Sequence, residues 1–100
     1  MDKREAQIVC QHLNVLMHRG KGLDRTQEME RFGSLLNRIR FDKHAGPEIR
    51  DRASQLQLRL SAWLSASRVD KKARRQVRTH LQADLGRLEH AIESFWPAAS

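Results

Sequence analysis

Aromatic residues are scarce in this 100-residue chain, which has no Tyr, three Phe and two Trp. A protein that binds single-stranded nucleic acid by stacking needs several exposed rings, so this composition argues against a stacking surface. Cysteine is nearly absent as well, and the single Cys10 cannot form an internal disulfide. A lone thiol suits a reducing compartment and the N-terminus is too charged for a secretory signal, so we expect a cytoplasmic protein.

Long apolar runs and β-strand patterns are also missing. No apolar run approaches the roughly 18 residues that a membrane span needs, so we expect no membrane partner. No segment alternates apolar and polar residues with β-branched enrichment, and the chain has only two prolines. The hydrophobic fraction of 39% is sufficient for one modest core in a chain of this length. These features predict a single all-α domain over residues 1–100.

Apolar residues recur at helical spacing in four segments. The expected helices cover approximately residues 2–19, 24–44, 47–67 and 71–96. Asp24 or Thr26 can cap the second helix and Asp70 the fourth, while Gly46 and Pro47 separate the second helix from the third. The predicted buried faces are Ala6, Val9, Leu13, Leu16 and Met17; Met29, Phe32, Leu35, Leu36 and Ile39; Ile49, Ala53, Leu56, Leu60, Trp63 and Leu64; and Val77, Leu81, Leu85, Leu88, Ile92 and Phe95.

Short connections between these helices favour an antiparallel four-helix bundle. One alternative stays open at this point. Residues 68–70 contain neither Gly nor Pro, so the third and fourth helices could instead be continuous, as one long bent helix in a helical oligomer.

Cations are concentrated around the start of the fourth helix. Residues 68–78 contain six Lys or Arg but one acid, in a chain with a formal net charge of +7. A helix N-terminus carries about half a positive charge, so each cation there costs about 0.3–1 kcal/mol at low salt. Because folding alone would favour acids, we infer an anionic partner, either nucleic acid or an acidic protein surface. The six cations are Arg68, Lys71, Lys72, Arg74, Arg75 and Arg78, of which Arg74 is expected nearer the core edge.

Two further pairs of Arg at heptad spacing predict basic lines on other helices. They are Arg31 with Arg38 on the second helix and Arg52 with Arg59 on the third. Whether these lines meet the basic segment depends on the packing of the helices, which the sequence does not determine. The helices are too long for a helix-turn-helix, and no zinc-finger or basic-zipper pattern is present. We therefore expect contacts to the phosphates of DNA or RNA, without base reading.

A second apolar line lies opposite the predicted core face on two helices. It consists of Ile8 and Val15, with His12 between them, on the first helix, and of Leu58 and Ala62 on the third. Apolar residues on both sides of a helix indicate either deeper burial or a second contact surface. We expect a protein interface, for self-association or docking onto a larger assembly. The alternative is that these are ordinary scattered surface residues.

Motifs for metal binding or catalysis are not evident. His80 and Asp84 lie one helical turn apart and predict a polar pair on the helix surface. The chain has no His-Glu-x-x-His motif and no paired cysteines, so we expect no metal and no cofactor. Residues 20–22 are glycine-rich but lack the spacing of a phosphate-binding loop, which predicts a turn. No nucleophile with a base and an orienting group is recognisable, so we expect no enzyme activity.

The leading hypothesis from the sequence is a small basic helical module that binds nucleic-acid backbone non-specifically. Such a module would act as an accessory subunit of a larger nucleoprotein assembly. The alternative is a regulatory adaptor or inhibitor, of the kind that phages and plasmids encode, whose basic surface binds an acidic protein.

Overall fold

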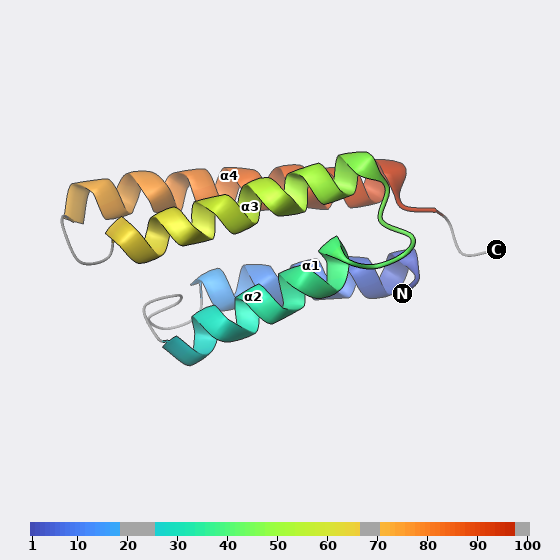
Figure 1. Cartoon of the computed structure of the whole chain (residues 1–100), viewed down its shortest axis with the longest axis horizontal. Helices are drawn as coiled ribbons and strands as arrows, with labels where there is room; N and C mark the ends of the chain where they lie inside the picture. The colour runs from blue at the N-terminus through green and yellow to red at the C-terminus, as the bar shows by residue number, and fades with distance from the viewer. Residues whose placement is uncertain (19–25, 67–70, 98–100) are drawn as a thin grey trace.

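Four α-helices make up the computed structural model, which describes residues 1–18, 26–66 and 71–97. They are α1 (Lys3–His18), α2 (Thr26–Arg40), α3 (Pro47–Ala66) and α4 (Lys71–Phe95). Each helix packs on two neighbours, so that α1 lies diagonally opposite α3, and α2 diagonally opposite α4 (Figure 1). The predicted antiparallel four-helix bundle is confirmed. Because α3 and α4 lie side by side, the alternative of one continuous helix is wrong.

The helix ends follow local hydrogen bonding. Asp2 caps α1, because its Oδ1 accepts a hydrogen bond of 2.8 Å from the backbone N–H of Glu5. The expectation that α2 extends to about His44 is wrong, since α2 ends at Arg40. In the turn that follows, Oδ1 of Asp42 accepts a 2.9 Å hydrogen bond from the backbone N–H of His44. The Asp42 side chain thus satisfies a backbone N–H that a longer helix would have to satisfy, so the backbone can turn here.

The other predicted boundaries have mixed outcomes. α3 begins at Pro47 as expected, and α4 ends at Phe95, just before Pro97. The proposed caps Asp24 and Asp70, like the turn at residues 20–22, lie outside the described residues.

A single hydrophobic core runs between the helices and contains most of the predicted residues. Met29, Leu35 and Val77 are only partly buried against it. Leu64 and Phe95 were expected in the core, but they are 53% and 56% exposed. The neighbouring Trp96 is buried instead of Phe95, and Cys10 adds to the buried face of α1. The fully or nearly buried positions are Ala6, Val9, Cys10, Leu13, Leu16, Met17, Phe32, Leu36, Ile39, Ala45, Ile49, Ala53, Leu56, Leu60, Trp63, Leu81, Leu85, Leu88, Ala91, Ile92 and Trp96.

α4 is much longer than its neighbour α1. At 1.5 Å per residue, the 25 residues of α4 span about 37 Å and the 16 residues of α1 about 24 Å. Cys10 of α1 and Glu89 of α4 line the same groove, so the antiparallel register brings His18 only to about the level of residue 81. Residues 71–80 therefore extend past the last described residue of α1, at the end of the bundle away from both termini (Figure 1). We call residues 71–80 the α4 tip.

The end of α3 follows the α4 tip beyond the start of α2 (Figure 1). Leu64, which is 53% exposed, lies in this last part of α3. In the part of the chain that the structure describes, no helix is both long enough and apolar enough to cross a membrane.

Candidate functional site

The α4 tip carries five cations and no acid: Lys71, Lys72, Arg74, Arg75 and Arg78. None of its ten side chains is buried, and all of the cations except Arg74 are exposed. The ion pairs of the described residues do not involve Lys71, Arg75 or Arg78. The sixth predicted cation, Arg68, lies outside the described residues. The α4 tip is therefore a basic surface on which the charges of Lys71, Arg75 and Arg78 are not neutralised by the ion pairs of the described residues.

Three of these cations lie along one side of α4. At 100° per residue, Lys71, Arg75 and Arg78 fall within about 60° of one another around the helix axis. Seven residues separate the first from the last, a distance of about 10 Å along the helix. The result is a short line of positive charge on a rigid element, which suits contact with successive anionic groups.

Arg74 has a different position. Its guanidinium carbon lies 5.0 Å from the centroid of the Trp63 ring, and Trp63 is only 5% exposed. The prediction that Arg74 lies nearer the core edge is confirmed. This cation–π contact between α4 and α3 holds the α4 tip against its neighbouring helix.

Asp84 is the single buried polar or charged residue among the described positions, with 4% exposure. The expected surface pair with His80 is therefore wrong. Arg59 of α3 donates from Nε to Oδ2 of Asp84 at 3.1 Å, and Arg87 donates from Nη1 to Oδ1 at 2.9 Å. A buried carboxylate is costly unless it is paired and hydrogen-bonded, and the two Arg side chains satisfy that requirement.

The basic lines predicted on the other helices do not all converge. Arg52 lines a hollow between α3 and α4 together with Arg87, so the α3 line, which also contains Arg59, meets α4. Arg31 and Arg38 are exposed on α2, which lies diagonally opposite α4. They therefore lie on a helix that does not contact α4. Sequence reasoning did not select Arg87 as a site residue, although its spacing of three from Asp84 was a usable signal.

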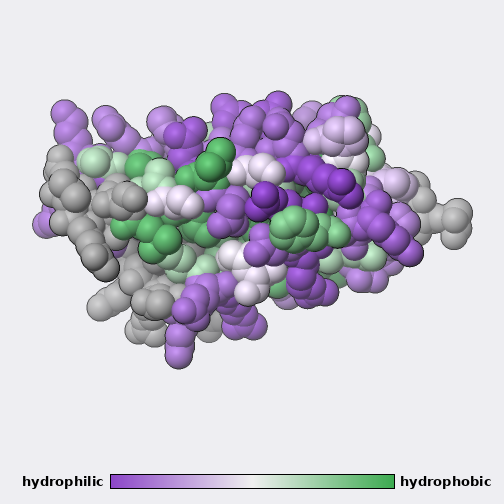
Figure 2. All heavy atoms as spheres, viewed as in Figure 1, coloured by the Kyte–Doolittle hydropathy of each residue, from purple (hydrophilic) through white to green (hydrophobic). Residues whose placement is uncertain are grey.

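The two predicted protein-interface lines are both exposed. Ile8 and Val15 are 42% and 50% exposed, Leu58 is 72% exposed, and His12 and Ala62 are also on the surface. The alternative that these lines are buried deeper within the bundle is therefore wrong. Because α1 and α3 are diagonal, the lines face different sides and form two separate surfaces. Apolar side chains also gather along the seam between α2 and α3, toward the end of α3 (Figure 2).

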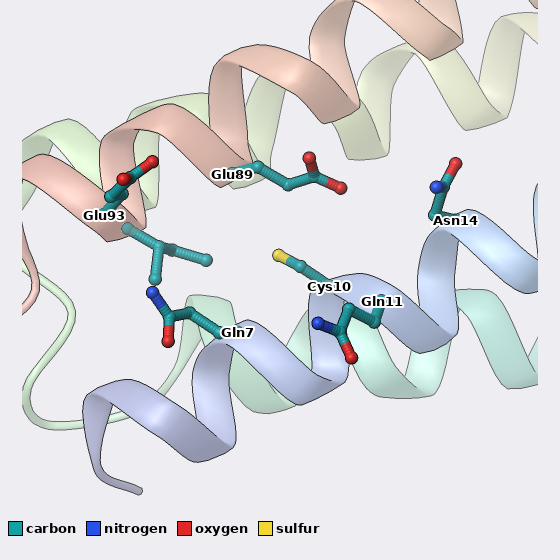
Figure 3. Close-up of a pocket in the computed structure, with 7 residues that line it drawn as sticks. Gln7, Cys10, Gln11, Asn14, Glu89 and Glu93 are labelled. Carbon is teal, nitrogen blue, oxygen red and sulfur yellow. The ribbon is translucent and has the colours of Figure 1, made fainter.

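A groove of about 460 Å³ between α1 and α4 has the opposite electrostatic character. Its labelled side chains are Gln7, Cys10, Gln11, Asn14, Glu89 and Glu93, and the Cys10 thiol points toward the Glu89 carboxylate (Figure 3). Partial burial raises the pKa of Glu89. Burial, and secondarily the charge of Glu89, raise the pKa of Cys10 to about 12.

This groove therefore offers neither a reactive thiolate at neutral pH nor a cation for an anionic ligand. In the described ranges, no three His, Cys, Asp or Glu side chains are grouped so that they could hold a metal ion.

Comparison of the chain with protein-family models, with curated proteins and with solved structures found no match. Its function has to be argued from its own residues.

Proposed function

We propose that this protein is a small helical module that binds the phosphate backbone of nucleic acid without sequence specificity, through the α4 tip. The observation that carries the proposal is the composition of this segment. It contains five cations, no acid and no buried side chain, at a helix N-terminus. The ion pairs of the described residues do not include Lys71, Arg75 or Arg78. Cations near a helix N-terminus are unfavourable for the helix dipole, and phosphate groups of a partner would compensate their charge.

The chemistry of the α4 tip suits phosphates better than bases. Arg75 and Arg78 can each donate two parallel hydrogen bonds to a phosphate, and Lys71 adds a point charge on the same line. Contacts of this kind fix the position of a protein on the backbone but carry no sequence information. The exposed apolar lines on α1 and α3 support an accessory role, because each could dock onto another subunit of a nucleoprotein assembly.

A second candidate is an adaptor or inhibitor that binds an acidic protein. One observation favours it: Leu58 and Ala62 are exposed next to Arg59 and line a shared hollow with it. A protein partner would bury this apolar surface, whereas a nucleic-acid backbone would leave most of it in water.

The test compares two double variants that remove the same charge. Arg75→Gln with Arg78→Gln changes the α4 tip, and Arg31→Gln with Arg38→Gln is the matched control on α2. Binding to a short labelled duplex is measured by fluorescence anisotropy between about 50 and 200 mM salt. We expect the tip variant to bind more weakly, with a salt slope shallower by up to about 1.8, at 0.9 for each phosphate that the protein no longer neutralises. The control should retain the wild-type slope.

Equal losses of affinity in both double variants would mean that binding follows net charge rather than the α4 tip. A wild-type protein that binds neither duplex DNA nor duplex RNA at low salt would end the proposal. Circular dichroism on each variant establishes that the helices are intact, so that a loss of binding is not a loss of folding.

A further inference from the structure

The carboxylate of Asp84 is bound by two guanidinium groups, although one would neutralise it. Arg59 and Arg87 together carry two positive charges and Asp84 one negative charge, so the cluster has a formal charge of +1. A single Arg would satisfy the charge requirement of the buried acid. The second Arg satisfies the other carboxylate oxygen and leaves the cluster with one positive charge that Asp84 does not neutralise.

Each oxygen of Asp84 accepts from a different Arg, Oδ2 from Nε of Arg59 and Oδ1 from Nη1 of Arg87. These two bonds use one N–H donor of each guanidinium, and the planar group carries several more. The side chains of Arg59 and Arg87 are 40% and 56% exposed, whereas that of Asp84 is 5% exposed. The buried carboxylate thus holds two partly exposed guanidinium groups beside each other, one from α3 and one from α4.

We infer that Arg59 and Arg87 form a binding site for a phosphate group, with Asp84 as the residue that positions them. The inference rests on the proposed function and adds to the α4 tip a second, separate phosphate contact at the face between α3 and α4. Binding normally costs the side-chain entropy of ordering two long Arg residues. Here Asp84 orders them before the ligand arrives, which favours a tight and geometrically defined contact.

Two hollows flank this site, and they differ in charge. The hollow beside Arg87 includes Gly86, where an added Cβ would meet nothing within 4 Å, so a ligand can approach the helix there. Glu48 and Asp51 also line that hollow and would repel a phosphate. The hollow beside Arg59 is lined by Gln55, Leu58 and Ala62 and contains no acid. A phosphate should therefore approach from the Arg59 side.

Arg87 and the line of tip cations lie on different sides of α4. Arg78 and Arg87 are nine residues apart, which is about 13 Å along the helix and, at 100° per residue, about half a turn around its axis. A phosphate held by the Asp84 cluster is therefore a contact separate from those of the α4 tip.

The decisive variants keep the charge and remove the guanidinium. The variants are Arg59→Lys and Arg87→Lys, each made singly. The compact ammonium of Lys cannot donate to Asp84 and to a phosphate at the same time in the planar geometry of a guanidinium. We expect each variant to bind the labelled duplex at least about fivefold more weakly than wild type, which corresponds to about 1 kcal/mol. Arg50→Lys, at an exposed Arg of α3, is the matched control and should bind like wild type. Each variant leaves one Arg on Asp84, so the fold should persist in thermal melting.

A second variant separates positioning from charge. Asp84→Asn removes a negative charge, so electrostatics alone predicts tighter binding. If Asp84 positions the two Arg side chains, the affinity should fall instead, because the amide keeps only one acceptor oxygen. Tighter or unchanged binding would contradict the positioning role. Should this variant fail to fold, the two Lys variants decide the question on their own.

The experiment distinguishes failure of this site from failure of the proposed function. If Arg75→Gln with Arg78→Gln weakens duplex binding while Arg59→Lys and Arg87→Lys bind like wild type, only the Asp84 cluster is refuted. If wild type binds no nucleic acid, both ideas fall. Polyglutamate that binds wild type as tightly as the duplex does, and binds the Lys variants more weakly, would assign the cluster to an acidic protein and overturn the phosphate assignment.

Discussion

The α4 tip and the rest of α4 belong to one continuous helix but differ in burial and charge. Residues 71–80 have no buried side chain, whereas residues 81–95 include six. The tip has five cations and no acid, and the remainder has three acids and one Arg. The buried residues of α4 are Leu81, Asp84, Leu85, Leu88, Ala91 and Ile92. Packing explains the composition of the second part of the helix, but it does not explain the exposed cations Lys71, Arg75 and Arg78 of the first part.

The charges of α4 also oppose its dipole at both ends. The first turns of the other three helices contain Glu5, Glu28 and Glu48, whereas the first turn of α4 has no acid and its last turn no base. Each misplaced charge costs about 0.3–1 kcal/mol, while a fully buried Leu or Ile contributes about 1.5–3 kcal/mol. The buried side chains of residues 81–95 therefore outweigh the unfavourable charges, and the helix can carry a basic end.

The largest expected difference between the two parts is in core packing. Leu81→Ala should lower the free energy of unfolding by about 2–5 kcal/mol, because Leu81 has no exposed surface. Val77→Ala, one turn earlier in the α4 tip, should cost less than about 1 kcal/mol, because Val77 is only partly buried. Urea denaturation measures both values. Equal costs would show that the α4 tip is packed as firmly as the remainder of the helix.

Charge reversal at the α4 tip should separate stability from binding. Replacing Lys71, Lys72, Arg75 and Arg78 with Glu places acids near a helix N-terminus, where each contributes about 0.3–1 kcal/mol within the first turn. We expect thermal stability at low salt to hold or rise, while duplex binding is lost. Arg74 is kept because it stacks on Trp63. A large fall in Tm would mean that the fold itself needs the cations, and added salt should reduce any gain in Tm.

The smallest expected effect concerns Glu89, whose raised pKa means that the folded protein holds its proton more tightly than the unfolded chain does. As the pH rises from the ordinary pKa of 4.5 through the raised pKa of the folded protein, ionisation of Glu89 therefore lowers the free energy of unfolding. Glu89→Gln should melt at a higher temperature than wild type at neutral pH, but not below about pH 4. A lower Tm at neutral pH would contradict this assignment. Leu13→Val, which has no titratable group, provides a variant whose effect on Tm should not depend on pH.

Features of the fold that depend on local sequence could be predicted. Four helices, the start at Pro47, the stop before Pro97 and most buried positions followed from periodicity and from Pro. Features that depend on relative helix length could not. Leu64 has the spacing of a core residue but is 53% exposed, in the part of α3 that extends beyond the start of α2 (Figure 1). Likewise, α2 ends at Arg40 rather than near His44, because the side chain of Asp42 stabilises a turn by accepting a hydrogen bond from the backbone of His44.

The candidate site was harder to predict than the fold. The α4 tip is contiguous in sequence, so its positive charge was visible without a structure. The cluster around Asp84 joins residues 25 positions apart, and no local pattern indicates that Arg59 will meet that carboxylate. For the same reason, the sequence could not show that Arg59 converges with Arg87 while Arg31 and Arg38 lie elsewhere.

The stacking of Arg74 on Trp63 gives the protein an internal optical reporter. Trp63 and Trp96 are both buried, but Trp63 lies beside the α4 tip, whereas Trp96 follows the opposite end of α4. Arg74 and Trp96 are 22 positions apart, or about 33 Å at the rise of a helix. We therefore expect the indole emission of Trp63 to respond to movement of Arg74, and that of Trp96 to changes at the far end of the bundle. Fluorescence from variants with a single Trp can follow each end of α4 without an attached dye.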